Sequence, residues 1–138
     1  MKKTLALVLA LLMCLTSVLA QCASDANTSK TTKIGFVVIG DENDQGYTYN
    51  FMNGMNAAIS QLKSEGYDVE LSVKRNIAED AGCVDANLAL AAEGCSIIFN
   101  NSYGFEQYMQ QAADEFPQVK FISLTNCGSQ VDGRDNTY

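Results

Sequence analysis

The side chains best suited to binding or catalysis form short polar runs, each directly after an apolar stretch. The first run is 41–46, the second is 100–103 and the third is 125–128. They supply carboxylate, amide and hydroxyl groups and contain no lysine or arginine. This chemistry favours a neutral, hydroxyl-rich or amine-bearing small molecule over a phosphate ligand.

Histidine is absent from the chain, which excludes Ser-His-Asp and Cys-His nucleophiles and His-ligated zinc. We therefore expect no catalytic residue and no cofactor. Asp44 could act as a catalytic carboxylate, but in front of a helix it could equally cap the helix N-terminus. A nucleoside hydrolase that uses Asp41 and Asp44 is the enzyme alternative, and it lacks a basic partner for the leaving group.

The first polar run begins like an EF-hand calcium loop and does not complete it. Asp41, Asn43 and Gln45-Gly46 have the starting pattern, but the twelfth position is Met52, where a bidentate glutamate is needed. We expect no metal site. No glycine-rich phosphate-binding motif follows the first apolar stretch either.

The elements that must position these runs alternate regularly from residue 33 onward. Buried strands are expected at 34–39, 67–74, 95–99 and 119–124, and helices at about 51–62, 79–93 and 105–115. This alternation predicts an α/β fold with a parallel sheet and flanking helices. Because ligands bind beyond the carboxyl ends of such strands, the polar runs are expected to form one site.

Residues 1–21 are typical of a secretory signal peptide, with Lys2 and Lys3 ahead of an apolar run too short to span a membrane. Cleavage after Ala20 by an ordinary signal peptidase is one interpretation. We favour the other, in which Leu19-Ala20-Gln21-Cys22 resembles a bacterial lipobox and Cys22 carries the lipid. Residues 22–32 are polar and predict a flexible tether, and residues 33–138 the folded part.

The whole chain has a formal net charge of −7, which argues against nucleic acid as a partner. Removal of residues 1–21 takes two of the nine basic residues and none of the sixteen acidic ones, so the mature charge is −9. Three cysteines, Cys83, Cys95 and Cys127, lie in the folded part. We expect them to be small buried hydrophobic residues, with Cys83 and Cys95 too far apart to form a disulfide.

Several blocks together resemble the basic membrane protein family, also called purine-nucleoside-receptor-like. Its members are substrate-binding lipoproteins of ABC importers. The stretch 43–50, with Gly54 behind it, is similar to the first ligand loop of the family. The blocks at 94–99, 102–105, 116–121 and 135–138 are similar to its later core blocks.

The resemblance implies the first lobe of a type I periplasmic-binding-protein fold that closes on a nucleoside or similar solute. Asp44 would hydrogen-bond the ligand, Tyr47 would stack where many members have Trp or Phe, and the second polar run would line the cleft. With the polar runs, this gives as ligand-binding candidates Asn43, Asp44, Tyr47, Asn101, Ser102, Tyr103 and Asn126.

The family's chains are more than twice as long as this one. We therefore expect this chain to form only the first of the two lobes and to bind a ligand weakly or not at all. The resemblance also implies an exported, membrane-anchored lipoprotein that faces the periplasm or cell exterior and serves an ABC permease. The alternative is a ligand-sensing domain of an extracellular signalling system.

Overall fold

The computed structural model describes residues 30–125 and 133–138. The predicted signal peptide, Cys22, Asn126 and Cys127 lie outside the described residues. Strands and helices alternate as predicted: β1 (Thr32–Val37), η1 (Glu42–Asp44), α2 (Tyr47–Ser64), β2 (Val69–Lys74), α3 (Ala81–Ala92), β3 (Cys95–Asn100), η2 (Tyr103–Phe105), α4 (Glu106–Glu115) and β4 (Lys120–Ser123).

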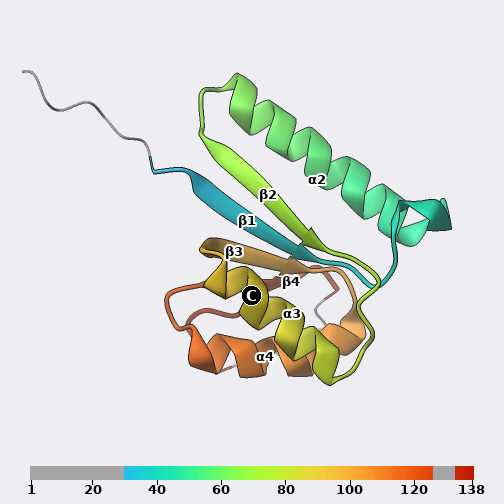
Figure 1. Ribbon diagram of the computed structural model, residues 1–138, viewed down its shortest axis with the longest axis vertical. Helices are drawn as coiled ribbons and strands as arrows, with labels where there is room; N and C mark the ends of the chain where they lie inside the picture. Colours follow the sequence, from blue (N-terminus) through green and yellow to red (C-terminus); the bar gives the residue numbers. More distant parts are fainter. Residues whose placement is uncertain (1–29, 126–132) are drawn as a thin grey trace, which may run out of the picture.

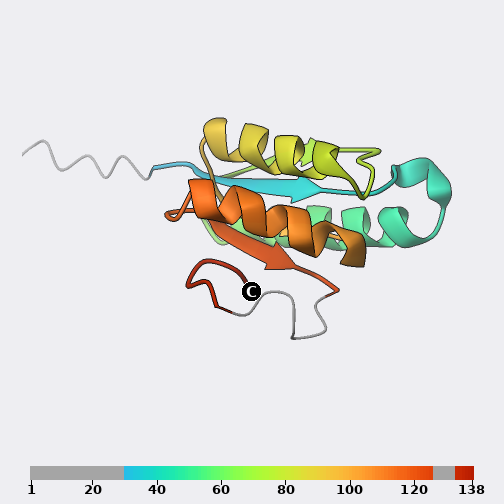
Figure 2. The same ribbon diagram turned by 90° about the horizontal axis from the view of Figure 1, so that it is seen from below.

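The four strands form one sheet in the order β2-β1-β3-β4, and each neighbouring pair is parallel. Helix α2 covers one face of the sheet, and α3 and α4 cover the other (Figures 1 and 2). The chain leaves β1 toward β2 on one side and later returns to β3 on the other. The topological switch point therefore lies between β1 and β3, where a ligand is expected.

The register brings the carboxyl ends of the central strands to one level. Val37 pairs with Lys74 of β2 and with Asn100 of β3, and Asn100 pairs with Ser123 of β4. The loops that follow these strands therefore start side by side. This edge is the one that the sequence predicts for the polar runs.

Most of the core lies between the sheet and the pair α3 and α4. Its largest side chains have no exposed surface: Phe105, Phe121, Met109, Leu90 and Ile98. A smaller core forms under α2, where Phe36, Val38 and Met52 pack together. Cys83 and Cys95 are buried and free, which confirms the prediction for these two.

Several boundaries differ from the predicted ones for local reasons. Helix α2 begins at Tyr47, four residues before 51, because Asp44 caps its first turn. Gly66 has a φ of 91°, a conformation that ends the helix and delays β2 until Val69. Strand β1 begins at Thr32, so the last residue of the predicted tether belongs to the sheet.

Within the described part of the chain, no helix has the length and apolar character that a membrane crossing requires.

Candidate functional site

The first two polar runs meet at the edge between β1 and β3, and Asn101 joins them. Its backbone N–H donates to the Val37 carbonyl (3.1 Å), and its side-chain Oδ1 accepts from the Ile39 N–H (3.0 Å). The Tyr47 hydroxyl donates to the Asn101 carbonyl. Ile39 and Tyr47, which flank the first run, therefore hydrogen-bond to Asn101 of the second run, and that the runs form one ligand site stays a prediction.

Asn101 also leaves one polar group without a partner. The residue has no exposed surface, and its Nδ2 makes no hydrogen bond to any described residue. A buried amide donor without a partner is costly, and such groups in native proteins often await a ligand or water. Contact between Asn101 and a ligand is therefore chemically possible and stays a prediction.

Asp44 caps helix α2. Its carboxylate accepts hydrogen bonds from three backbone amides, those of Gly46 (3.0 Å), Thr48 (2.7 Å) and Tyr49 (3.0 Å). These bonds, above all that from Gly46, lower the pKa of Asp44 to about 2. Of the two roles that the sequence left open, the cap is the one present, and contact with a ligand stays a prediction.

Acidic groups and one arginine surround this capped turn. Asp41 accepts from the Asn43 N–H (2.9 Å), so exposed Asn43 lies in a fixed turn. Arg75, from the loop after β2, binds both carboxylate oxygens of Glu42 (Nε–Oε2 2.9 Å, Nη2–Oε1 2.8 Å). The three polar runs contain no arginine, but Arg75 from the loop after β2 lies beside the first of them. Pairing with Glu42 offsets the charge of Arg75.

A second residue from that loop region was missed by the sequence analysis. Glu79 lies between β2 and α3, and its carboxylate accepts from the Ser102 hydroxyl and from the Gly104 N–H (3.1 Å). The rule that placed the other runs, polar residues after the carboxyl end of a strand, also applies to this loop. Ser102 is buried and held by this contact, whereas Tyr103 is 51% exposed.

A buried amide pair supports the site from behind. Asn100, at the end of β3, and Asn87, on α3, have no exposed surface and exchange two side-chain hydrogen bonds (2.9 and 3.0 Å). Asn87 Nδ2 also donates to the Cys83 carbonyl (2.9 Å). Because the pair fixes the last residue of β3, it also fixes where Asn101 begins.

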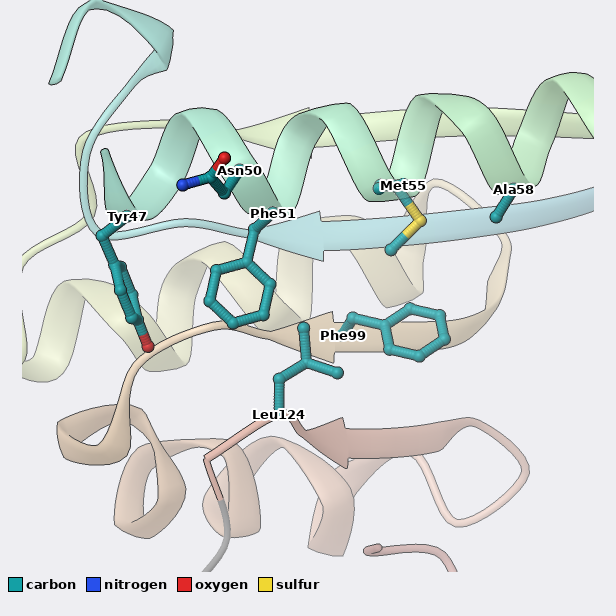
Figure 3. Close-up of a pocket in the computed structure, with 8 residues that line it drawn as sticks. Tyr47, Asn50, Phe51, Met55, Ala58, Phe99 and Leu124 are labelled. Atoms are coloured by element: carbon teal, nitrogen blue, oxygen red, sulfur yellow. The ribbon is translucent and has the colours of Figure 1, made fainter. Parts of the chain in front are cut away.

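An apolar pocket of about 520 Å³ opens beside the polar edge, on the α2 face of the sheet (Figure 3). The ring of Tyr47 meets that of Phe51 edge to face, with centroids 5.0 Å apart. Tyr47 is thus shared by the polar edge and the pocket. The lining residues are Tyr47, Asn50, Phe51, Gly54, Met55, Ala58, Phe99 and Leu124.

Known proteins are similar to this chain in sequence and in fold. The family of PnrA-like ABC transporter substrate-binding proteins matches residues 31–136. The chain belongs to this family. The resemblance inferred from the sequence blocks is thereby confirmed.

One relative of this PnrA-like chain is a purine-binding protein of Brucella abortus (strain 2308). The two are 31% identical over 100 residues, which are 72% of this chain and 28% of the relative. The PnrA-like chain therefore spans less than a third of the length of that protein.

Two solved structures share the fold. A solute-binding protein of an ABC transporter system from Conexibacter woesei DSM 14684 matches with a TM-score of 0.53 and 20% identity, over 66% of this chain and 28% of its own. The branched-chain amino acid binding protein LivJ from Streptococcus pneumoniae, in complex with isoleucine, matches with a TM-score of 0.66 and 22% identity, over 79% and 33%. The predicted parallel α/β sheet of a type I periplasmic binding protein is thus confirmed.

Proposed function

We propose that this PnrA-like chain is the amino-terminal lobe of an extracytoplasmic protein that binds a nucleoside-like solute for an ABC importer. The observation that carries the proposal is the edge between β1 and β3. There Tyr47 bridges the two loops, and the buried Nδ2 of Asn101 has no partner among the described residues. Proteins of this family and fold bind solutes and are not enzymes.

The charge of the edge supports an uncharged ligand. Three acidic side chains of the first loop and Glu79 gather at the edge, and the Arg75 guanidinium is already paired with Glu42. A phosphate would meet repulsion here, whereas hydroxyl and amine donors would find acceptors. The half-exposed rings of Tyr47 and Tyr103 would contact a base, which fits the purine binding of the Brucella relative.

The proposed lobe is one half of a clamp. A small ligand in a cleft is buried on most of its surface, and a single edge offers contacts from one side only. The apolar pocket beside α2 also leaves Leu124 37% exposed, which is consistent with a further element that covers this face. We therefore propose that this chain alone binds the solute weakly.

Export and anchoring complete the proposal. Residues 1–21 would direct secretion, and a lipid on Cys22 would hold the lobe at the membrane through residues 22–31, near the permease that receives the solute. Mass spectrometry of the membrane fraction tests this part separately: an unmodified amino terminus at Gln21 would overturn the lipid anchor.

An NMR titration tests the binding proposal. Residues 22–138 carrying Cys22→Ser would be titrated with inosine, guanosine, adenosine, uridine and adenosine 5′-monophosphate. We expect amide shifts at Tyr47 and 101–104 with a dissociation constant on the order of 1 mM, and weaker binding of the monophosphate. No shift at these amides with any nucleoside would overturn the nucleoside proposal, and micromolar affinity would overturn the half-clamp.

A further inference from the structure

Glu79 ties together two loops that are far apart in the sequence. Its Oε1 accepts from the Gly104 N–H (3.1 Å), and the Ser102 hydroxyl donates to the same oxygen. Ser102 and Gly104 lie one and three residues after Asn101, whose carbonyl accepts from Tyr47. Tyr47 therefore hydrogen-bonds to the second polar run at Asn101, and Glu79 hydrogen-bonds to it at Ser102 and to Gly104, the residue directly after the run.

The backbone is shaped to admit this carboxylate. A Cβ added to Gly104 would lie 2.3 Å from the carboxyl carbon of Glu79 and 2.5 Å from its Oε1. Such distances are too short for a Cβ and a non-bonded atom, so any side chain at 104 would displace the carboxylate at the end of the Glu79 side chain. The contact is thus a close fit between a glycine backbone and one acidic side chain.

Glu79 also lies near enough to Tyr47 for its charge to act there. The pKa of Tyr47 is raised, first by burial of the hydroxyl and then by the negative charge of Glu79. Tyr47 and Glu79, which hydrogen-bond to residues 101–104, therefore lie at the same edge of the sheet.

We propose that Glu79 is a positioning residue of the ligand site, which fixes residues 102–104 so that Asn101 and Tyr103 are placed for the solute. This inference rests on the proposed function. It assigns Glu79 a role through the loop rather than through contact with the solute. An uncharged glutamine keeps the Oε1 acceptor, so Glu79→Gln should preserve the hydrogen bonds to the loop and Glu79→Ala should abolish them.

The first experiment needs no solute. Amide hydrogen exchange at Gly104 would be measured by NMR in residues 22–138 carrying Cys22→Ser. We expect exchange about tenfold faster in Glu79→Ala and near the parent rate in Glu79→Gln, since one hydrogen bond protects this amide. Glu70→Ala, which removes an exposed acid near the opposite end of β2, is the matched control and should leave Gly104 unchanged.

Unchanged exchange at Gly104 in Glu79→Ala would overturn the proposal. Because Glu79 is exposed, we expect thermal midpoints close to the parent value. Should Glu79→Ala unfold, Ser102→Ala, which removes one of the two donors, replaces it and should accelerate Gly104 exchange by a smaller factor.

The second experiment adds inosine. We expect Glu79→Ala to weaken binding about tenfold, Glu79→Gln by less than about threefold, and Glu70→Ala not at all. Equal loss in the alanine and glutamine variants would show that the charge meets the solute directly and would overturn the positioning role. If the parent chain binds no nucleoside, the proposed function fails, while the exchange rate of Gly104 still decides whether Glu79 fixes the loop.

Discussion

Asn87 and Asn100 exchange two side-chain hydrogen bonds in the interior, one from each Nδ2 to the other's Oδ1 (2.9 and 3.0 Å). The pair joins helix α3 to the last residue of β3, and neither residue has exposed surface. Buried amides that satisfy each other specify one packing arrangement, because any shift leaves unpaired groups. The edge between β1 and β3 is therefore supported from behind by a buried pair of amide side chains.

Breaking this pair should destabilise the fold. Asn100→Ala leaves Asn87 Oδ1 buried without its donor, and we expect a loss of about 1–3 kcal/mol in the free energy of unfolding, measured with urea. The double variant Asn87→Leu/Asn100→Leu removes both amide groups. Its loss in the free energy of unfolding should be smaller than the sum of the losses in Asn87→Leu and Asn100→Leu alone. A loss of less than about 0.5 kcal/mol in the free energy of unfolding of Asn100→Ala would contradict the role of the pair.

The sequence pattern was sufficient for the sheet, since apolar runs and helical periodicity are local signals. It also placed Tyr47 and Asn101 at one edge, because the carboxyl ends of parallel strands must meet. It did not reveal Glu79, whose contact with Gly104 spans 25 positions and depends on how the loop after β2 folds back. Nor could it decide between cap and ligand for Asp44, because both roles need a carboxylate at the start of a helix.

Asp44 should make stability depend on acid pH. Its folded pKa of about 2 lies below the ordinary value of 3.8, so its stabilising effect is full above that value and is lost as pH falls toward 2. Thermal midpoints of the parent chain and Asp44→Ala should differ at pH 6 and converge near pH 2.

Asp44→Ser separates the cap from its charge. The serine hydroxyl can accept only part of the three bonds that Asp44 accepts, so this variant should be at most slightly more stable than Asp44→Ala at pH 6 and should share its weaker response to acid. A gap between parent and Asp44→Ala that stays constant from pH 6 to pH 2 would contradict the capping role.

The thiol of Cys83 should be inert in the folded protein. Burial is the main cause that raises its pKa to about 12, and burial also raises the pKa of Cys95. Since the thiolate is the reactive form, a variant of residues 22–138 with Cys22→Ser and Cys127→Ser should not react with a disulfide reagent at pH 8. Two thiols should react at once in 6 M guanidinium, which serves as the control, and rapid labelling of the native protein would contradict the prediction.

Tyr47→Phe should keep the ring contact of this residue and remove its hydrogen bond. The ring remains against Phe51, but the hydroxyl that donates to the Asn101 carbonyl is lost, at a cost of about 1 kcal/mol in unfolding free energy. Because burial and the charge of Glu79 raise the pKa of Tyr47 above 10.0, its neutral form stabilises the fold until the pH passes its folded pKa. The difference between the alkaline titrations of the parent and Tyr47→Phe, followed by absorbance at 295 nm, should therefore have its midpoint above 10.0. Tyr67→Phe, at an exposed position outside the site, is the control for stability and should leave the unfolding free energy near the parent value. A difference titration with its midpoint at the ordinary value of 10.0 would contradict the burial of this hydroxyl beside Glu79.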